Sequence, residues 1–486
     1  MTTSDRSHLG PADQQVTAVF ERFIGAARWF GGKGREFRLG GLEHLGWLGK
    51  GEEGVRVRIE LATIEYADGG LDVYQVPVAY YTEAQQRLEH ALIGQWDDPE
   101  MGPVFGYDAL HDRHATAVWL AAFDSEHSDE RVSFHRIAGH DLDLDTHGTL
   151  FSGEQSNSSV AFGEDSLMKL FRRVTPGRNP DIEIHEVLTA VDSEHVAALY
   201  GWAEASPASD APVEEQPTQL AMLQQFLRTA SDGWDLALAS VRDLFAEADL
   251  HADEVGGDFA AEAHRLGVAV AEVHDSLREH FPTETWGPEE LEILVGSMKS
   301  RLAEAVEIVP GLSDHADDLR AVYDAVTTIS EPVVVQRVHA DFHLGQTLRT
   351  VRGWKIVDFE GEPAKPLSER VRPDSGWRDV AGMLRSLDYA AHAVEADVEE
   401  GAQIAYRALE WAERNRLAFL EGYIEASGRT EGGVLSPDQQ VLLRAYEIDK
   451  AVYETVYETR NRPTWLAIPM SGIERLTDTS EEEQTE

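Results

Sequence analysis

The chain has 486 residues, of which 42% are hydrophobic and 27% charged, so it should fold, and its length predicts two or three structural units. Its 88 acidic and 42 basic residues give a formal net charge of -46, which repels nucleic acid and anionic membrane surfaces. The absence of cysteine excludes disulfides, thiolate metal sites and a cysteine nucleophile.

The first residues, MTTSDRSHLGPADQQ, lack the charged and then apolar pattern of a secretory signal. No apolar run approaches the ~20 residues that cross a bilayer. We therefore expect a cytoplasmic protein with no membrane partner and no nucleic-acid partner.

Residues 1–90 predict a small α+β cap. Apolar residues at helical spacing indicate a helix around 16–24, and period-two alternation indicates strands over 55–67 and 71–81. The segment ARWFGGKGRE at 27–36 contains three glycines and is expected to form a turn.

Residues 91–227 predict a strand-rich lobe. We expect strands at TAVWLAAF (116–123), SSVAFG (158–163) and LMKLF (167–171), and a helix at DIEIHEVLTAV (181–191). The proline-rich, acidic segment 203–219 lies between two apolar strand patterns, so it is interpreted as a solvated loop between strands.

Residues 228–486 predict a mostly helical lobe. Amphipathic patterns place helices near 233–247, 258–280, 288–305, 400–427 and 436–458. A β segment, VVVQRVHADFHLGQTLRTVRGWKIVDFEGEP, interrupts them. The polar residues of this segment carry the strongest chemical signal in the chain.

Asp341 follows the apolar run VVVQRV, Gln346 comes five residues later, and Asp358 ends the strand pattern WKIV. Phosphoryl transfer needs a carboxylate that positions and deprotonates the acceptor hydroxyl. It also needs oxygen ligands for Mg²⁺, and an amide followed by a second carboxylate at this spacing is typical of kinases. The pattern predicts Asp341 as the base and Gln346 and Asp358 as magnesium ligands.

Two other interpretations of this segment remain open. The residues around Asp341 are also consistent with a simple turn at a strand end, capped by the aspartate. His339, Asp341 and His343 could alternatively ligate zinc in a hydrolase, because imidazole and carboxylate groups suit that ion.

Lys169 lies inside the apolar run LMKLF, where a buried ammonium needs an anionic partner. Glu183, on the predicted helix that follows, is the expected partner, with Glu186 as the alternative one turn later. A strand lysine paired with a helix glutamate is how kinases direct a cation at the ATP phosphates.

Further ATP contacts are expected at two places. Small polar residues in the turn before the lysine strand, including Gln155, Ser156 and Ser158, can turn N–H and hydroxyl groups toward phosphates. The strand LAMLQQFL, with Gln224 and Phe226, would connect the lobes and offer backbone groups to adenine. A plain hairpin turn and a plain strand are the alternatives.

The acceptor is expected near one helix of the C-terminal lobe, because sugars bind to charged hydrogen-bonding groups and to aromatic faces. The predicted contacts are Asp449, Lys450, Tyr453, Glu454, Tyr457, Arg460 and Trp465, together with His343 and Glu360 of the β segment. A solvated helix is the alternative. Asp379, near the start of another helix, either braces the catalytic loop through backbone N–H groups or simply caps its helix.

These residues and the long segments around them resemble the actinobacterial maltokinases over nearly the whole chain. The matching segments are RWFGGKGR, YQVPV, EQSNSSV, MKLFRR, NPDIE, VHADFHLGQTLRT, DFEGEPAKPLSER, RDVAGMLRSLDYAA and DKAVYETVYETRNRPTWLAIP. The resemblance implies a bilobal α+β fold like that of protein kinases and aminoglycoside phosphotransferases, with an extra N-terminal cap. Ala340 is a departure, because the family usually has glycine there.

The resemblance also implies the activity. A maltokinase uses ATP and Mg²⁺ to phosphorylate maltose at the anomeric hydroxyl, giving maltose 1-phosphate and ADP for α-glucan synthesis. It implies ATP and maltose as small-molecule partners, and a trehalose–maltose interconverting enzyme as a protein partner. A kinase of glucosamine or another monosaccharide, and a catalytically silent nucleotide-binding regulator, are the alternatives.

Overall fold

The computed structural model describes residues 11–151, 156–207, 216–228, 230–247, 250–362, 365–395, 402–428 and 433–477. The chain divides into two compact units. The first comprises Met1–Glu186 and Ala197–Arg228, and the second comprises Val187–Val196 and Thr229–Glu486. The first sheet continues beyond residue 90, where the sequence predicted the end of the cap. That boundary stays a prediction.

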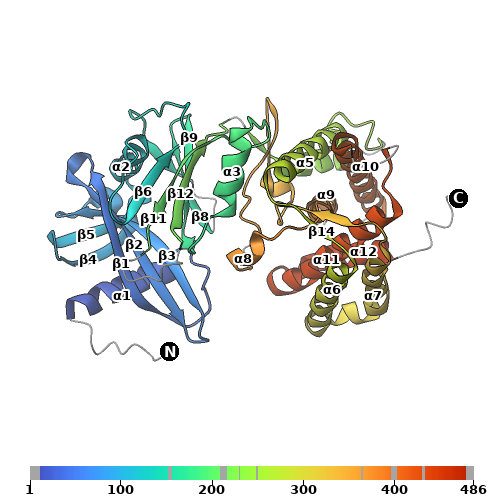
Figure 1. The fold of residues 1–486 in the computed structure, drawn as a ribbon, viewed down its shortest axis with the longest axis horizontal. Helices are drawn as coiled ribbons and strands as arrows, with labels where there is room; N and C mark the ends of the chain where they lie inside the picture. Colours follow the sequence, from blue (N-terminus) through green and yellow to red (C-terminus); the bar gives the residue numbers. More distant parts are fainter. Residues whose placement is uncertain are drawn as a thin grey trace. The chain divides into compact units, whose positions relative to one another are not determined.

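The first unit begins with an antiparallel sheet. Its strands, in spatial order, are β1 (Phe37–Lys50), β2 (Arg56–Tyr66), β3 (Leu71–Tyr81), β5 (Gly102–Asp108) and β4 (Leu92–Asp98), and β10 (Arg173–Val174) also pairs with β3. The two strands expected before residue 90 are confirmed as β2 and β3. Helix α1 (Pro11–Ala26), also expected, packs Phe20 and Ile24 into the core on one face of this sheet (Figure 1).

A second antiparallel sheet completes the first unit. Its order is β6 (Val132–Arg136), β11 (Leu199–Ala205), β12 (Thr218–Gln225), β9 (Ser166–Phe171), β8 (Asn157–Phe162) and β7 (Gly148–Leu150). Strands β11 and β12 are antiparallel neighbours, so the acidic segment between them connects two strands as expected. Helix α3 (Pro180–Ala190) also forms where the sequence predicts it.

The strand expected at 116–123 is wrong, because these residues lie in helix α2 (Arg113–Asp124). The Asp112 carboxylate accepts a hydrogen bond from the His114 N–H and caps the helix. The two residues of the run that are not buried, Ala117 and Ala121, are both apolar, so no polar face marks a helical period. A short apolar run of this kind does not distinguish a buried strand from a buried helix.

Arg172 joins the two sheets of the first unit. Its guanidinium is 1% exposed, lies 2.8 Å from Asp108 Oδ2 of the first sheet, and donates from Nε to Ser158 Oγ of the second at 2.8 Å. The same group lies 4.8 Å from the centroid of the Trp29 ring. A buried charge is tolerated only when it is paired and hydrogen-bonded in this way.

The second unit is mostly helical. Its helices are α4 (Gly233–Ala246), α5 (Ala260–His280), α6 (Pro288–Ile308), α7 (Ala316–Ala325), α8 (Leu367–Arg370), α9 (Trp377–Glu395), α10 (Ala402–Ser427), α11 (Pro437–Asn461) and α12 (Ala467–Thr477). Two short sheets accompany them, formed by β13 (Ser231–Asp232), β16 (Thr347–Thr350) and β17 (Gly353–Ile356), and by β14 (Glu284–Trp286) and β15 (Val333–Val335). The five helices expected beyond residue 228 are confirmed.

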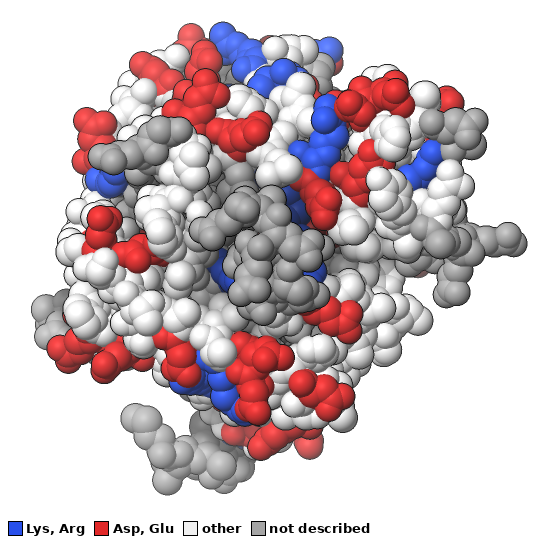
Figure 2. Space-filling model, turned by 90° about the vertical axis from the view of Figure 1, so that its right-hand side faces the viewer, with Lys and Arg blue, Asp and Glu red and all other residues white. Residues whose placement is uncertain are grey.

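Acidic side chains are spread over the face drawn in Figure 2, with basic side chains scattered among them rather than gathered into a broad patch. This agrees with the excess of acidic residues in the sequence. Among the residues that the structure describes, no helix combines the length and the apolar character that a bilayer crossing requires.

Replacing Arg172 by methionine tests the link between the sheets. The change leaves the Asp108 carboxylate buried without its cation, so we expect a loss of about 3–5 kcal/mol in the free energy of unfolding. Urea denaturation of the full chain measures it. The exposed Arg320→Met, whose partner is Asp317, should cost less than about 1 kcal/mol. Equal, small losses for both variants would contradict the role assigned to Arg172.

Candidate functional site

The predicted base and magnesium ligands lie on one β segment of the second unit. β15 leads into the loop that carries Asp341, and Gln346 ends a short 3-10 turn immediately before β16. β16 pairs with β17, and the Val357 N–H donates to the Gln346 carbonyl at 3.0 Å. The hairpin therefore brings Gln346 next to Asp358, where the amide Nε2 lies 3.2 Å from Oδ2.

Asp379 of α9 holds the loop that precedes the base. Its two carboxylate oxygens accept backbone hydrogen bonds from His339, at 2.7 Å, and from Ala340, at 2.8 Å. It also accepts a hydrogen bond from His274 Nε2 at 3.0 Å. Burial alone would raise the pKa of Asp379, but His274 and the loop lower it below its usual value, so the carboxylate stays ionised. Bracing of this loop through backbone N–H groups, one of the two expectations for this residue, is confirmed.

The backbone is strained at two positions in this segment. Ala340 has a φ of 70° and Asp358 a φ of 67°, both in the left-handed region that favours glycine. Ala340 therefore adopts the conformation for which glycine is better suited, and its N–H is held there by Asp379. Strain of this kind persists only where the surroundings fix the backbone, and it is concentrated at functional sites.

Asp341 has a cationic neighbour. Lys450 of α11 donates from Nζ to Asp341 Oδ1 at 3.3 Å. Burial would raise the pKa of Asp341, but the Lys450 ammonium and the neighbouring histidines lower it, so the group is a carboxylate at neutral pH. The pKa of Lys450 is raised in turn, since Asp341 and Glu454 outweigh its burial.

His339 is used by the loop itself. Its Nε2 lies 3.0 Å from the Val357 carbonyl oxygen, and its Nδ1 accepts from the Asp341 N–H at 3.4 Å. The ring also packs near Phe342 and Phe359. With both ring nitrogens bonded to backbone, His339 has no lone pair free for a metal, which argues against the zinc interpretation. Burial lowers the pKa of His343, and Asp341 only partly offsets this.

The residues around Gln346 and Asp358 fit a magnesium ion. Mg²⁺ prefers hard oxygen ligands such as carboxylate, amide and water, and it is usually held by one or two protein groups together with substrate phosphates. The carboxamide of Gln346 faces the Asp358 carboxylate. When the amide group is flipped, its oxygen takes the place of its nitrogen beside that carboxylate. The donor set therefore contains oxygen ligands and no sulfur.

On α11, the residues expected to contact the acceptor fall into two groups. The acidic ones are paired inside the unit: Arg301 binds Asp449 through two nitrogens at 2.7 and 3.0 Å, and Arg385 binds Glu454 at 2.8 and 3.1 Å. Tyr453 and Tyr457 are exposed by 42% and 44%. The helix thus presents aromatic faces beside carboxylates that are already held by arginines.

Three other residues are expected to contact the acceptor. Arg460 is exposed near the end of α11, and Trp465 follows the helix with the Arg462 guanidinium 4.3 Å from its ring centroid. Glu360 is partly buried two residues after Asp358. Contact of these residues with a sugar stays a prediction.

In the first unit, Lys169 pairs with a residue that the sequence interpretation missed. Its Nζ lies 2.8 Å from Asp181 Oδ2 at the start of α3, two residues before Glu183. Burial would raise the pKa of Asp181, but Lys169 and His185 lower it well below the usual range. Glu186, the other candidate, instead pairs with Arg178. The sequence correctly predicted the helix, but Asp181 was not among the partners proposed for the lysine. A role for Glu183 stays a prediction.

The remaining ATP contacts stay predictions. Ser158 is buried on β8 and its hydroxyl accepts from Arg172, which favours a structural role for it. Ser156 is exposed just before the same strand, while Gln155 lies outside the described residues. On β12, the Gln224 side chain is 9% exposed, and the Phe226 ring, just beyond the strand, lies 5.8 Å from that of Phe151.

Comparison with known proteins places this geometry in context. Residues 23–112 match the family described as the maltokinase N-terminal cap domain. The chain is 29% identical over 343 residues to a glucosamine kinase of Streptacidiphilus jiangxiensis, covering 67% of this chain and 73% of that protein. It is 27% identical over 335 residues to a glucosamine kinase of Mycolicibacterium smegmatis, covering 67% and 78%.

The fold is also similar to a solved structure, a glucosamine kinase in complex with glucosamine, ADP and inorganic phosphate. The match has a TM-score of 0.67 at 22% identity and covers 94% of this chain and 99% of that one. The expected α+β, kinase-like architecture with an additional N-terminal cap is therefore confirmed.

Replacing Ala340 by glycine tests the strain beside the base. Relief of the left-handed conformation is worth roughly 1–2 kcal/mol, and the more flexible unfolded chain offsets about 0.4–1 kcal/mol of this gain. We expect a net gain of about 0–1.6 kcal/mol in unfolding free energy, measured by urea denaturation. Ala303→Gly, at an exposed position inside α6, should instead lose about 0.5–1 kcal/mol. Equal losses for both variants would refute strain at Ala340.

Proposed function

Since the chain is a sugar kinase of the maltokinase type, we propose that it transfers the γ-phosphoryl group of ATP to the anomeric hydroxyl of maltose, giving maltose 1-phosphate and ADP. The observation that carries the proposal is the loop of the second unit. There the ionised Asp341 is followed by Gln346 and Asp358 on one hairpin, and Asp379 fixes the backbone before it.

In the proposed reaction, Asp341 accepts a hydrogen bond from the anomeric hydroxyl and orients its oxygen toward the γ-phosphorus. As the new O–P bond forms and the bond to ADP breaks, the hydroxyl proton passes to the Asp341 carboxylate. The phosphoryl group is transferred directly, so no covalent enzyme intermediate is needed. Most of the rate enhancement then comes from positioning and from stabilisation of charge.

Three residues serve the nucleotide in this proposal. Gln346 and Asp358 would hold magnesium, which when bound neutralises charge on the phosphates. Lys169, held in place by its ion pair with the ionised Asp181, contacts the phosphates of ATP. Lys450 places a further positive charge beside Asp341.

Maltose is favoured as the acceptor by the match of residues 23–112 to the maltokinase cap. The exposed Tyr453 and Tyr457 support a sugar acceptor, since aromatic faces pack against sugar rings. The relatives named glucosamine kinases favour glucosamine as the second candidate. Both candidates use the same base and the same nucleotide, so only the acceptor distinguishes them.

An acceptor screen tests the proposal. With ATP and Mg²⁺, we expect ADP release with maltose that exceeds the release with glucosamine, glucose, trehalose and aminoglycosides. The product should have lost its reducing end, because the anomeric oxygen carries the phosphate. Phosphorylation of glucosamine in preference to maltose would refute the acceptor and leave the kinase fold standing. No ADP release with any sugar would favour the silent regulator.

Asp341→Asn in the same assay separates catalysis from binding. We expect turnover to fall by about 10²–10⁴-fold while ATP affinity changes little, because the amide keeps the shape of the side chain but cannot accept the proton. Asp317→Asn, at a side chain exposed on α7, is the matched control and should leave turnover unchanged. An Asp341→Asn enzyme of near-native rate would exclude this residue as the base.

The pH dependence of the reaction should report the contact between Lys450 and Asp341. Activity requires the Asp341 carboxylate, so it falls as pH decreases through the pKa of that group. Because Lys450 lowers this pKa, Lys450→Met should raise it and move the acid limb of the kcat/KM profile to higher pH. Lys299→Met, which removes an exposed lysine paired with Asp324, should leave the limb in place. An unmoved limb in Lys450→Met would show that another group controls it.

A further inference from the structure

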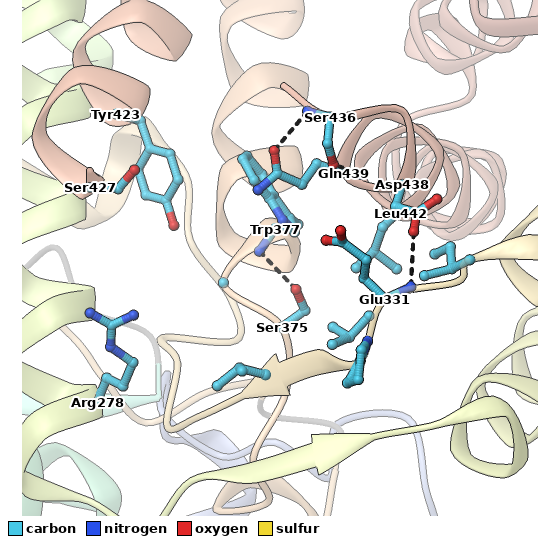
Figure 3. Close-up of a pocket in the computed structure, with 15 residues that line it drawn as sticks. Arg278, Glu331, Ser375, Trp377, Tyr423, Ser427, Ser436, Asp438, Gln439 and Leu442 are labelled. Carbon is cyan, nitrogen blue, oxygen red and sulfur yellow. Dashed lines mark hydrogen bonds between the residues drawn. The ribbon is translucent and has the colours of Figure 1, made fainter. Parts of the chain in front are cut away.

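A cavity of about 310 Å³ lies in the helical unit (Figure 3). None of the residues that line it belongs to the segment from Asp341 to Asp358. Its walls come from the end of α5, the segment that leads into β15, the start of α9, the end of α10 and the start of α11. Its volume is at the lower end of the ~300–1,000 Å³ typical of small-molecule sites. It holds roughly ten water volumes, enough for a ligand of monosaccharide size.

The lining combines an aromatic ring with hydrogen-bonding groups of both charges. The aromatic ring is that of Trp377, and the hydrogen-bonding groups are those of Arg278, Glu331, Ser375, Ser427 and Gln439. In Figure 3 the Arg278 guanidinium lies to one side of the cavity and the carboxylates of Glu331 and Asp438 lie to the other. Neither sign of charge dominates, which disfavours a strongly ionic ligand and favours a neutral one with many hydroxyl groups.

Local hydrogen bonds hold several of the polar walls in place. Ser436 and Gln439 form a reciprocal capping box at the start of α11, with bonds of 2.9 and 3.2 Å. Asp438 Oδ2 accepts from the Glu331 N–H at 3.1 Å, and Ser375 Oγ accepts from the Trp377 N–H at 3.3 Å. These contacts reduce the ordering that a ligand must impose, so the site is largely pre-organised.

One wall of the cavity is connected to the catalytic loop through buried hydrogen bonds. The hydroxyl of Tyr423 lies 3.0 Å from His274 Nδ1, and His274 Nε2 lies 3.0 Å from Asp379 Oδ2. Asp379 in turn binds the backbone just before the base. Tyr423 and His274 are each 2% exposed and Asp379 is 1% exposed. Because the Asp379 carboxylate only accepts, His274 Nε2 carries the hydrogen of that bond.

Backbone packing provides a second connection. Gln336, just after β15, exchanges two backbone hydrogen bonds with Asp374, at 2.8 and 2.9 Å, and its side chain donates to the His274 carbonyl at 2.6 Å. Gly376 on the cavity wall packs closely against the histidine, since a Cβ there would lie 3.0 Å from His274 Nδ1, closer than most such contacts. Movement of this wall therefore reaches both the histidine and the strand that leads into the loop.

From these contacts we propose that the cavity binds a neutral saccharide at a second, non-catalytic site, and that its occupancy changes turnover through Tyr423, His274 and Asp379. The ring of Trp377 provides the platform for one sugar face, and Glu331 and Gln439 bind its hydroxyl groups. The binding of a saccharide in the cavity does not depend on the proposed function. The effect on turnover rests on the proposed function.

Binding is tested by titrating the full chain with maltose in a calorimeter and counting sites. We expect two sites in the wild type and one in Trp377→Ala and in Glu331→Ala, a change at an exposed side chain that should not affect folding. The control Glu292→Ala, exposed on α6, should retain two. If maltose is not the acceptor, we expect one site in the wild type and in the control, and none in the two cavity variants. An unchanged count in both cavity variants overturns the proposal.

The ligand class is tested with glucose, glucosamine and glucose 6-phosphate in the same titration. The difference in binding between the wild type and Glu331→Ala isolates the cavity. We expect glucose to bind there about tenfold more tightly than either charged sugar. Equal or tighter binding of a charged sugar overturns the assignment to neutral saccharides.

The effect on turnover is tested by comparing kcat at saturating maltose, with the acceptor that the screen identifies. Both sites are then occupied in the wild type, whereas the cavity of Glu331→Ala is empty, so the two kcat values should differ by about fivefold or more. Tyr423→Phe keeps the ring but removes the hydroxyl, so it should still bind maltose in the cavity, and adding Glu331→Ala to it should leave its kcat unchanged. Equal kcat values in the wild type and Glu331→Ala, or an equal difference in the Tyr423→Phe background, overturn the proposed connection.

Discussion

The hydrogen bonds between Asp379 and the backbone of His339 and Ala340 are the interaction on which the rest of the second unit depends. An ionised carboxylate that is 1% exposed is stable only if its oxygens are fully used, and two backbone donors together with His274 use them. The loop is thereby fixed in a strained conformation that Ala340 would not adopt by itself. Two further residues on the same face of α9 extend the contact: a Cβ at Gly382 would lie 2.5 Å from the Phe342 carbonyl oxygen, and the Ser386 hydroxyl accepts from the Leu344 N–H at 3.1 Å. These positions recur every three or four residues, so one helix serves as the template for the catalytic loop.

The same helix is joined to three neighbouring helices through arginine. Arg385 is fully buried and binds both Asp388 of α9 and Glu454 of α11. Asp388 also receives Arg416 of α10 and Arg475 of α12, so four helices share one buried network. Such a network adds little net stability, because desolvation of the charges offsets their attraction, but loss of a single member leaves an unpaired buried charge. In a chain with only 42 basic residues, arginines committed to the interior leave a surface dominated by carboxylates.

Much of this architecture could be predicted because it follows from local pattern. The amphipathic helices of the second unit, strands β2 and β3, and the spacing of Asp341, Gln346 and Asp358 all come from periodicity or from the chemistry of a short segment. What could not be predicted depends on contacts between distant segments. In the predicted run, helix α2 exposes alanines rather than polar residues, and so lacks a polar side that marks its period. The contact of Asp181 with Lys169 depends on which side of α3 faces β9, and the role of Arg385 depends on helices far apart in the sequence.

The contact between Lys450 and Asp341 bears on how the proposed reaction uses its base. A cation at 3.3 Å lowers the pKa of the carboxylate, so Asp341 binds a proton less strongly than an isolated aspartate would. A strong base is not required if the acceptor oxygen attacks a loose, metaphosphate-like group, because little negative charge must form on that oxygen before the bond to ADP weakens. The carboxylate then acts mainly by orienting the hydroxyl, which calls for a rigid backbone more than for high basicity. A loop that Asp379 holds with a left-handed alanine meets that requirement, and the lysine that lowers the pKa of Asp341 keeps a positive charge beside that carboxylate.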